Sequence, residues 1–406
     1  MLPHPDGVCL RSSGEALAWH DHRTCLPEVG RLCHRPEMNR RENERLIRAI
    51  EDARKTGQRI AIATVVRVRG SAYRREGARI VVREDGSYEC LLSGGCLEPA
   101  VAETAAHVLS TGQPVIREYD LEEDSIWSLA LGCTGAVDIC IERLEDDPVT
   151  NQWLATIGAS EAAVLVKSLS GGQGRLLVRE QDSMGSLGDD TADREAIERA
   201  RARLTATVPV SGTERIGRVD VFFDVTLPPP ELVVFGAGPD AEPLARLGWE
   251  LGFAVTVVDV RAAFLTHERF PHARLIAEHF SRFHERLALH RRSYAVIMNH
   301  HLERDRESLR FALGSSAAYI GALGPRSRFQ KLLGGLRDHG VVLDPAHVAR
   351  VHSPVGLALG AESPEEIAIS IIGEILAIQR GFDGGSLAGR DGSLHRSSDT
   401  SAFARS

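Results

Sequence analysis

Residues 232–261 read LVVFGAGPDAEPLARLGWELGFAVTVVDVR. An apolar, β-branched run leads into a turn with Gly236 and Gly238, a helix-like stretch follows, and a second such run ends at Asp259. Strand, glycine turn, helix and strand in this order are typical of the unit that binds the phosphates of a dinucleotide. The stretch therefore predicts a Rossmann-like fold.

Each marked residue of this stretch has an expected role in holding a nucleotide. Gly236 permits the tight turn, Gly238 lets a phosphate approach the backbone, and Ala241 is small enough for the helix to pack on the sheet. The carboxylate of Asp259 can accept hydrogen bonds from ribose hydroxyls, and free N–H groups at the start of the helix attract an anion. Pro239 removes one of these donors, so the same fold without a bound nucleotide stays an alternative.

Downstream of this unit, strand-like and helix-like segments continue to alternate. Strands are expected within 273–278 (ARLIAE), 293–301 (SYAVIMNHH) and 317–328 (AAYIGALGPRSR), and a helix capped by Ser363 closes the series. This alternation predicts a doubly wound parallel sheet whose carboxyl-terminal strand ends face a ligand crevice. His300 lies at the end of one of these strands, and we expect it to line the crevice.

The chain divides at three consecutive prolines, 228–230, which are expected to act as a stiff linker. The Rossmann-like domain is predicted over 228–382 and an N-terminal α/β domain over 39–227. Residues 1–38 and 383–406 lack a sustained hydrophobic period and are predicted to be a disordered extension and a disordered tail.

The N-terminal domain carries a sign of internal duplication. ARIVVRE (78–84) is similar to GRLLVRE (174–180), and AVDIC (136–140) is similar to RVDVF (218–222). These matches predict two repeats, at 39–145 and 160–227. A chance similarity between strand-rich segments is the alternative.

The first of these repeats predicts a regular series of elements. An amphipathic helix over 42–57 is followed by a strand over 59–68 that is apolar enough to be buried on both faces. Further strands are expected after residue 78, over 87–95, over 114–120 and over 135–144, with a helix over 96–112.

Composition narrows the possible functions. The chain of 406 residues has 43% hydrophobic and 26% charged residues and a net charge of -8. This charge argues against a nucleic-acid partner, and no apolar run is long enough to span a membrane. Seven cysteines, with no secretory signal pattern, favour reduced thiols in the cytoplasm.

The turn Ser93-Gly94-Gly95-Cys96 stands between an expected strand and an expected helix. Two glycines permit a sharp bend with exposed N–H groups, and the positive end of the following helix favours an ionised thiol at Cys96. Cys133, also flanked by glycines, could converge on the same place from a second loop. The alternative is that both are small apolar side chains in tight turns. For Cys90 and Cys140, which fall within expected strands, core packing is the prediction.

The motifs GSAYRREGARIVV, SGGCLE, LGCTGAVDICIERL, VVFGAGPDAEPLARL, AAYIGALGPRSR and SPVGLALGAESPEEIAISIIGEI occur in this order. Together they resemble the XdhC/CoxI family of xanthine dehydrogenase accessory proteins over roughly residues 40–382. The resemblance implies a chaperone that binds the molybdenum cofactor, supports its sulfuration and delivers it to an apo molybdenum hydroxylase of the xanthine dehydrogenase family. Thr134 departs from the glycine expected in the family's second cysteine motif.

The same resemblance implies roles for individual residues. Cys96 would touch molybdenum, carry a persulfide or contact the pterin dithiolene, with Ser93, Gly94 and Gly95 shaping the site. Arg79, with Arg74 and Arg75 of the same segment, would pair with the pterin phosphate. It implies a cofactor that is molybdopterin or its cytidine dinucleotide, and a cysteine desulfurase as a further partner. A solvated basic turn is the alternative for Arg79, and a homodimer is expected from the general frequency of such assemblies.

Two other functions are compatible with the sequence. An NAD(P)-dependent oxidoreductase would use Gly236, Gly238 and Asp259, although no obvious catalytic group accompanies them. A non-catalytic scaffold that docks a hydroxylase subunit would not need the Cys96 thiol.

Overall fold

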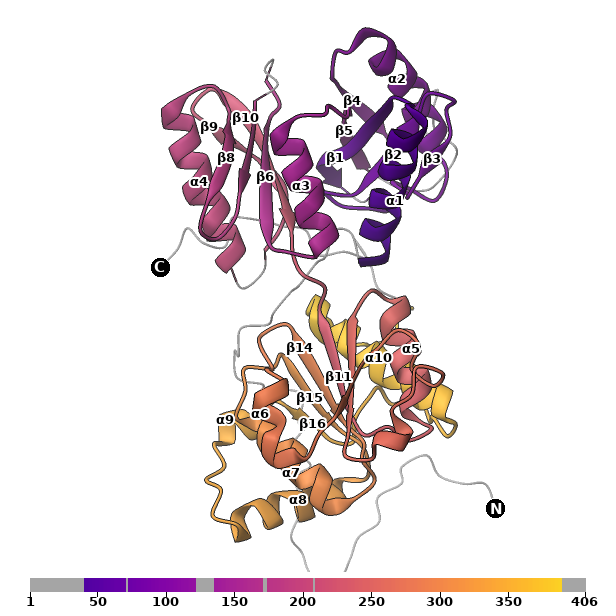
Figure 1. Ribbon diagram of the computed structural model, residues 1–406, viewed down its shortest axis with the longest axis vertical. Coiled ribbons are helices and arrows are strands. Elements are labelled where there is room, and N and C mark those ends of the chain that lie inside the picture. The colour runs from indigo at the N-terminus through magenta and orange to yellow at the C-terminus, as the bar shows by residue number, and fades with distance from the viewer. Residues whose placement is uncertain (1–39, 71, 122–134, 171–173, 207–208, 389–406) are drawn as a thin grey trace, which may run out of the picture. The chain divides into compact units, whose positions relative to one another are not determined.

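The computed structural model describes residues 40–70, 72–121, 135–170, 174–206 and 209–388. Within these residues the chain folds as an α/β protein with three sheets, two of five strands and one of six (Figure 1). The predicted fold class is thereby confirmed. The predicted extension at 1–38 and most of the predicted tail lie outside the described residues.

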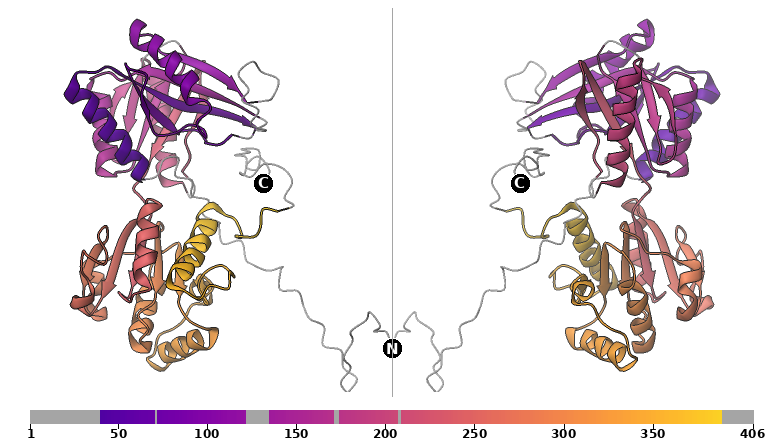
Figure 2. Two further views of the ribbon diagram at one scale, coloured as in Figure 1. Left: turned by 90° about the vertical axis from the view of Figure 1, so that its right-hand side faces the viewer. Right: turned by 90° about the vertical axis from the view of Figure 1, so that its left-hand side faces the viewer.

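The first sheet is antiparallel and has the strand order β3-β2-β1-β5-β4. Its long strands β1 and β5 run side by side (Figure 2). Helix α2 packs on one face of the sheet and helix α1 on the other. The elements are α1 (Arg40–Thr56), β1 (Ile60–Gly70), β2 (Arg79–Arg83), β3 (Tyr88–Glu89), α2 (Glu98–Thr111), β4 (Val115–Asp120) and β5 (Gly135–Arg143).

Hydrophobic patterning explains these elements. Strand β1 is buried along its first seven residues, because it packs against α2 on one face and against α1 and α3 (Pro148–Ala159) on the other. The expected strand over 87–95 is wrong in length, since β3 stops at Glu89. Cys90 adopts a left-handed backbone conformation with φ of 72°, which ends the extended chain.

The second sheet has the order β8-β7-β6-β10-β9, which reproduces that of the first sheet strand for strand. In each repeat, one helix precedes the first strand and a second helix follows the third strand. This correspondence supports the predicted duplication. The elements are α3 (Pro148–Ala159), β6 (Ala163–Ser168), β7 (Arg175–Val178), β8 (Ser183–Ser186), α4 (Asp190–Thr205), β9 (Gly212–Ile216) and β10 (Val219–Thr226).

Strand register gives a residue-by-residue equivalence between the repeats. Thr64 is opposite Arg79 and Cys140 in the first sheet, and Lys167 is opposite Arg175 and Phe222 in the second. Two positions along, Ile62 pairs with Glu142 and Leu165 pairs with Asp224. The equivalent pairs are therefore Thr64 and Lys167, Arg79 and Arg175, Cys140 and Phe222, and Glu142 and Asp224.

The two repeats contact each other reciprocally. Arg79 of the first repeat donates a hydrogen bond to Asp224 of the second, and the equivalent Arg175 donates to Glu142 of the first, both at 2.7 Å. Such exchange of equivalent contacts is the mark of two-fold related partners. The repeats are thus related by a pseudo-two-fold axis, and the Arg67 guanidinium binds the equivalent residues Asp138 and Asp220.

The third sheet is parallel, with the order β13-β12-β11-β14-β15-β16. Helices α5 and α10 pack on one face and α6, α7 and α8 on the other (Figure 1). Its elements are β11 (Glu231–Phe235), α5 (Ala241–Glu250), β12 (Ala254–Asp259), β13 (Arg274–Ala277), α6 (Phe283–Arg286), β14 (Ser293–Ile297), α7 (Leu302–Leu313), β15 (Tyr319–Ala322), α8 (Arg326–Asp338), α9 (Pro345–Val348), β16 (Val351–His352) and α10 (Pro364–Arg380).

This topology has a switch point. From the central strand β11 the chain first builds β12 and β13 on one side and then returns to build β14, β15 and β16 on the other. Ligands of open α/β sheets bind at such a point, outside the carboxyl ends of the strands. The predicted cap of the last helix is present, because Ser363 and Glu366 form a capping box at the start of α10.

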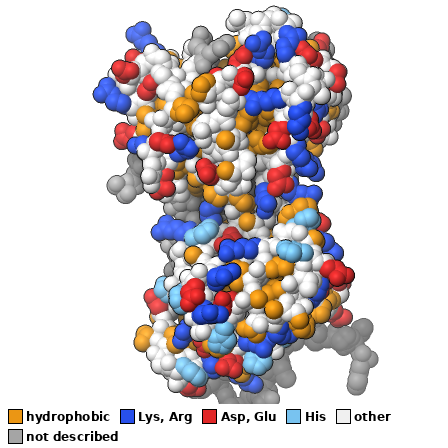
Figure 3. Space-filling view, in the orientation of Figure 1, with side chains coloured by type: hydrophobic (Ala, Val, Ile, Leu, Met, Phe, Trp, Pro, Cys, Tyr) orange, Lys and Arg blue, Asp and Glu red, His pale blue; other side chains and the backbone are white. Residues whose placement is uncertain are grey.

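The surface in Figure 3 carries interspersed positive and negative side chains, without a large block of one sign. None of the helices in the described part of the chain has the length and apolar character that a bilayer crossing requires.

Candidate functional site

The turn before α2 is organised by the Ser93 hydroxyl. Its Oγ accepts hydrogen bonds from the N–H groups of Gly95 (3.2 Å), Cys96 (3.1 Å) and Leu97 (3.1 Å), and it donates one to the carboxylate of Glu98. Gly95 has φ of 106°, a conformation that favours glycine. The turn therefore uses three of its own N–H groups internally, in contrast to the exposed donors expected from the sequence.

The carboxylate of Glu98 also holds this turn through hydrogen bonds. Its side chain is fully buried and accepts hydrogen bonds from the N–H groups of Leu92 (2.9 Å) and Ser93 (2.7 Å). Burial by itself would raise the pKa of Glu98, but the hydrogen bonds from Ser93 and the backbone outweigh it and lower the pKa. A buried carboxylate thus holds the turn in one conformation.

Cys96 is half-buried on this turn, and the neighbouring Gly94 and Gly95 are less enclosed. An atom placed at the Cβ position of either glycine would meet nothing within 4 Å, so there is open space beside the cysteine. The predicted second cysteine, Cys133, lies outside the described residues. Within the described residues, no three His, Cys, Asp or Glu side chains are grouped to hold a metal ion.

The thiols of the other described cysteines, Cys90 and Cys140, are hard to ionise. Burial raises the pKa of Cys90 to about 11 and that of Cys140 to about 12. Both thiols therefore stay protonated at neutral pH, in line with their expected packing role.

Arg79 is buried between the two repeats. Its side chain is 3% exposed and pairs with Asp224, which is fully buried, while its Nε donates to the carbonyl oxygen of Gly77 at 3.1 Å. This geometry favours a structural ion pair over the predicted contact with a pterin phosphate, and it also excludes the alternative of a solvated turn.

The glycine turn of the C-terminal domain has the geometry of a tight strand-to-helix connection. Gly236 has φ of 117°, and a Cβ atom there would lie 2.5 Å from the carbonyl oxygen of Met298, directly after the neighbouring strand β14. Ala241 is fully buried at the start of α5, in the core between this helix and the sheet. These positions match the local roles expected of them, while nucleotide binding stays a prediction.

Asp259 ends β12 beside this turn, but its carboxylate is already occupied. It accepts hydrogen bonds from the N–H groups of Ala237 (2.8 Å) and Arg261 (2.9 Å) and from the Arg261 guanidinium (2.7 and 3.0 Å). Burial would raise the pKa of Asp259, yet the bonds from Arg261 and the backbone lower it. A ribose can reach this carboxylate only if Arg261 moves away.

His300 and Asp240 also meet at the turn. His300 Nε2 lies 2.6 Å from Asp240 Oδ2, and the Cβ position of Gly238 lies 2.5 Å from Asp240 Oδ1. His300 is exposed, with φ of 56°. The structure thus brings His300 beside the glycine turn and places a carboxylate at the helix start where an anion was expected, while the role of His300 in a ligand crevice stays a prediction.

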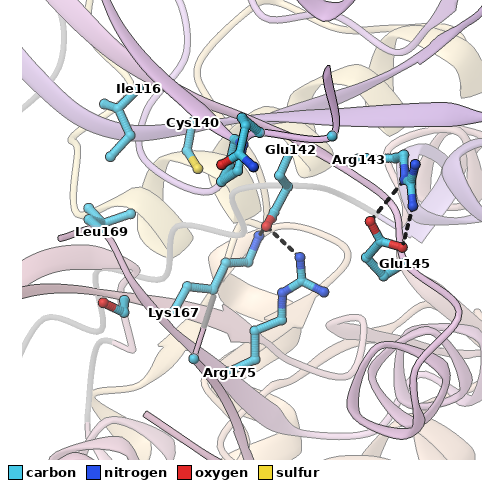
Figure 4. A pocket seen from close by; sticks show the side chains of 13 residues that line it. Ile116, Cys140, Glu142, Arg143, Glu145, Lys167, Leu169 and Arg175 are labelled. Atoms are coloured by element: carbon cyan, nitrogen blue, oxygen red, sulfur yellow. Dashed lines mark hydrogen bonds and ion pairs between the residues drawn. The ribbon is translucent and has the colours of Figure 1, made fainter. Parts of the chain in front are cut away.

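A cavity of ≈ 360 Å³ lies between the two repeats, and its residues were not singled out from the sequence. We call it the inter-sheet cavity. Glu142 stands between Lys167 and Arg175, with Ile116, Cys140 and Leu169 on one side and the Arg143–Glu145 pair on the other (Figure 4).

One signal in the sequence pointed to this cavity. Lys167 and Arg175 interrupt or border apolar strand segments, and in the aligned repeats they correspond to Thr64 and Arg79. A charged side chain within a buried strand needs a partner of opposite charge. Here that partner is Glu142 of the first repeat, and an alignment of the two repeats does not reveal a contact between them.

Both halves of the chain contain a segment that matches a known protein family. A family described as "XdhC and CoxI family" matches residues 53–120, and one described as "XdhC Rossmann domain" matches residues 232–375. A solved structure from Bacillus halodurans, described as a xanthine dehydrogenase, superimposes with a TM-score of 0.66 at 29% identity, covering 85% of this chain and 97% of that one.

Two curated relatives match over most of their lengths. "Molybdenum cofactor insertion chaperone PaoD" of Escherichia coli (strain K12) is 23% identical over 85% of this chain and 92% of its own. A probable xanthine dehydrogenase subunit of Bacillus subtilis (strain 168) is 31% identical over 79% of this chain and 93% of its own. With a relative matched along nearly its full length and both halves assigned to one family, the chain belongs to the XdhC/CoxI family.

Proposed function

We propose that this chain is a maturation factor that binds the molybdenum cofactor, supports its sulfuration and delivers it to a molybdenum hydroxylase of the xanthine dehydrogenase family. The observation that carries this proposal is Cys96, half-buried beside open space on a turn that Ser93 and the buried Glu98 hold rigid. The names of the relatives, a chaperone of cofactor insertion and a probable component of xanthine dehydrogenase, support the same role.

The chemistry of the cofactor suits a single thiol on this turn. Molybdenum and the dithiolene of molybdopterin are soft, and a cysteine sulfur is a soft ligand. Because the described residues supply no cluster of metal ligands, the cofactor is best treated as cargo that keeps its own dithiolene ligands. Cys96 would then contact the metal or carry the incoming sulfur, with a cysteine desulfurase as its source.

The C-terminal domain would hold the phosphate or nucleotide end of this cargo. The turn at Gly236 and the switch point between β11 and β14 provide the backbone geometry for it. A cytidine dinucleotide form of the cofactor would require Arg261 to release Asp259. The same occupied carboxylate, together with Asp240 at the helix start, gives less support to an NAD(P)-dependent oxidoreductase.

Reconstitution of a hydroxylase tests this function. Apo-hydroxylase is mixed with molybdenum cofactor and a cysteine desulfurase, with and without this chain, and hydroxylase activity is measured over time. We expect activity only, or much faster, when the wild-type chain is present, and a large loss with Cys96→Ser. Equal activation by the wild type and by Cys96→Ser would support a docking scaffold instead, and equal activity without the chain would contradict a maturation role.

A further inference from the structure

The inter-sheet cavity differs from the equivalent place on the other side of the pseudo-two-fold axis. On that other side, Phe222 is fully buried, Thr64 is 1% exposed, and the Arg79–Asp224 pair is sealed in. Charges there balance, since one guanidinium faces one carboxylate. We call this the closed side, because all four of these side chains are buried.

Two substitutions between the repeats change this arrangement on the open side. Cys140 stands where the other repeat has Phe222, and Lys167 stands where it has Thr64. The first substitution removes the volume of an aromatic ring, and the second adds a cation. Both Cys140 and Lys167 line the inter-sheet cavity.

Besides the Arg143–Glu145 pair, the charged lining of the cavity is Lys167, Arg175 and the carboxylate of Glu142. Lys167 and Arg175 share the single carboxylate of Glu142, and the Lys167 side chain is only 5% exposed. Arg175 has a second acceptor in Asp147 at 3.2 Å, but this carboxylate caps α3 and does not line the cavity. A buried ammonium group with one carboxylate partner still has donors directed away from that partner, and burial makes an extra counter-charge favourable.

The cavity has the size and the lining of a small-molecule site. Its volume of ≈ 360 Å³ falls within the range typical of ligand pockets. Apolar side chains of Ile116 and Leu169 lie on one side of the charged cluster (Figure 4). Ile116 is a lining residue that is itself exposed, so it marks the mouth of the cavity.

We propose that the inter-sheet cavity binds a small organic anion, whose carboxylate or phosphate group faces Lys167 and Arg175 and whose apolar part lies against Ile116 and Leu169. The site is independent of the cysteine turn and of the proposed maturation function. Both sides of the pseudo-two-fold axis hold an Arg–carboxylate pair, and the side with Cys140 and Lys167 contains this cavity.

Titration calorimetry on the full chain at neutral pH and constant ionic strength tests the site. The probes are inorganic phosphate, benzoate, and benzamide as the uncharged counterpart of benzoate. Saturable binding of phosphate alone assigns a phosphate ligand, and saturable binding of benzoate alone assigns a carboxylate ligand; either result, or binding of both, supports the site. No saturable binding of either anion, or binding of benzamide as tight as that of benzoate, overturns it.

Variants locate the binding in this cavity. Lys167→Met removes the charge at similar length and should weaken anion binding roughly tenfold or more. Cys140→Phe introduces the residue of the closed side, and Ile116→Trp narrows the mouth from an exposed position in case Cys140→Phe disturbs folding. Thr64→Val, on the closed side, is the matched control and should bind like the wild type. Unchanged affinity in a folded Lys167→Met protein would overturn the proposal.

Discussion

Arg79 and Asp224 are 145 residues apart in the chain, yet they form a 2.7 Å ion pair whose side chains are 3% and 0% exposed. The pair joins β2 of the first repeat to β10 of the second. Its pseudo-symmetric counterpart, the ion pair of Arg175 with Glu142, joins β7 of the second repeat to β5 of the first. The N-terminal half of the chain is thus held together by an ionic contact that appears twice.

Arg79→Ala should strongly destabilise the protein, because it leaves the buried carboxylate of Asp224 without its partner. We expect the free energy of unfolding to fall by about 3–5 kcal/mol, measured by urea denaturation. Arg179→Ala is the matched control, since Arg179 pairs with Asp182 on the surface, and it should leave stability within experimental error. Equal effects of the two substitutions would show that the Arg79 pair is not structural.

Low pH should lower the free energy of unfolding, because the carboxylate of Glu142 becomes protonated. Burial would raise its pKa, but attraction to Lys167 and Arg175 lowers it from 4.5 to about 2. Because the folded-state pKa is depressed, the contribution of Glu142 to stability is present above pH 4.5 and is lost as the pH falls toward about 2. The loss should be on the order of 3 kcal/mol.

Glu142→Gln isolates this contribution. Its free energy of unfolding should lie below that of the wild type at neutral pH, and the difference should shrink as the pH is lowered through the same range. A difference that stays constant with pH would mean that the Glu142 carboxylate titrates normally in the folded protein.

The Rossmann-like domain was largely predictable, because the signals that define it come from residues close together in the sequence. Residues 232–261 carry strand, turn and helix signals that depend only on neighbours in the chain, and the capping box at Ser363 is local in the same way. The similarity of the two five-stranded sheets could be expected because their strand sequences share a pattern. Strand β3 was overestimated, since the left-handed conformation of Cys90 has no signal in residue type.

Gly236→Ala tests the strand-to-helix turn. The new methyl group would lie 2.5 Å from the carbonyl oxygen of Met298, in a backbone conformation that alanine rarely adopts. We expect a loss of about 1–3 kcal/mol in the free energy of unfolding. Gly334→Ala in α8 is the control, because its Cβ position meets nothing within 4 Å and alanine favours a helix. A tolerated Gly236→Ala would contradict the tight turn.

The described thiols should differ in reactivity. At neutral pH, Cys96 should be alkylated by iodoacetamide faster than Cys90 and Cys140, because it is half-buried beside open space whereas burial raises the pKa of the other two to about 11 and about 12. Peptide mass spectrometry over a time course gives the order. Cys140 or Cys90 reacting first would contradict the described environment of the turn.

The site was less predictable than the fold because residue type alone does not say which donor pairs with which acceptor. The Arg79 partner is in the other repeat, Arg261 covers Asp259, and the Ser93 hydroxyl consumes the N–H groups that the glycines were expected to expose. Residue types identified the right turns in each case. Which donors and acceptors remain available there depends on side-chain hydrogen bonds, long-range for Arg79 and local for Arg261 and Ser93, that the motifs do not specify.

The most direct test of the account is the amount of pterin that the protein retains. The wild type, Cys96→Ala and Cys90→Ala are purified from cells that make molybdopterin, and bound pterin is oxidised and measured by fluorescence. We predict pterin with the wild type and with Cys90→Ala, and a large loss with Cys96→Ala. Equal pterin in all three proteins would contradict a cofactor site at Cys96.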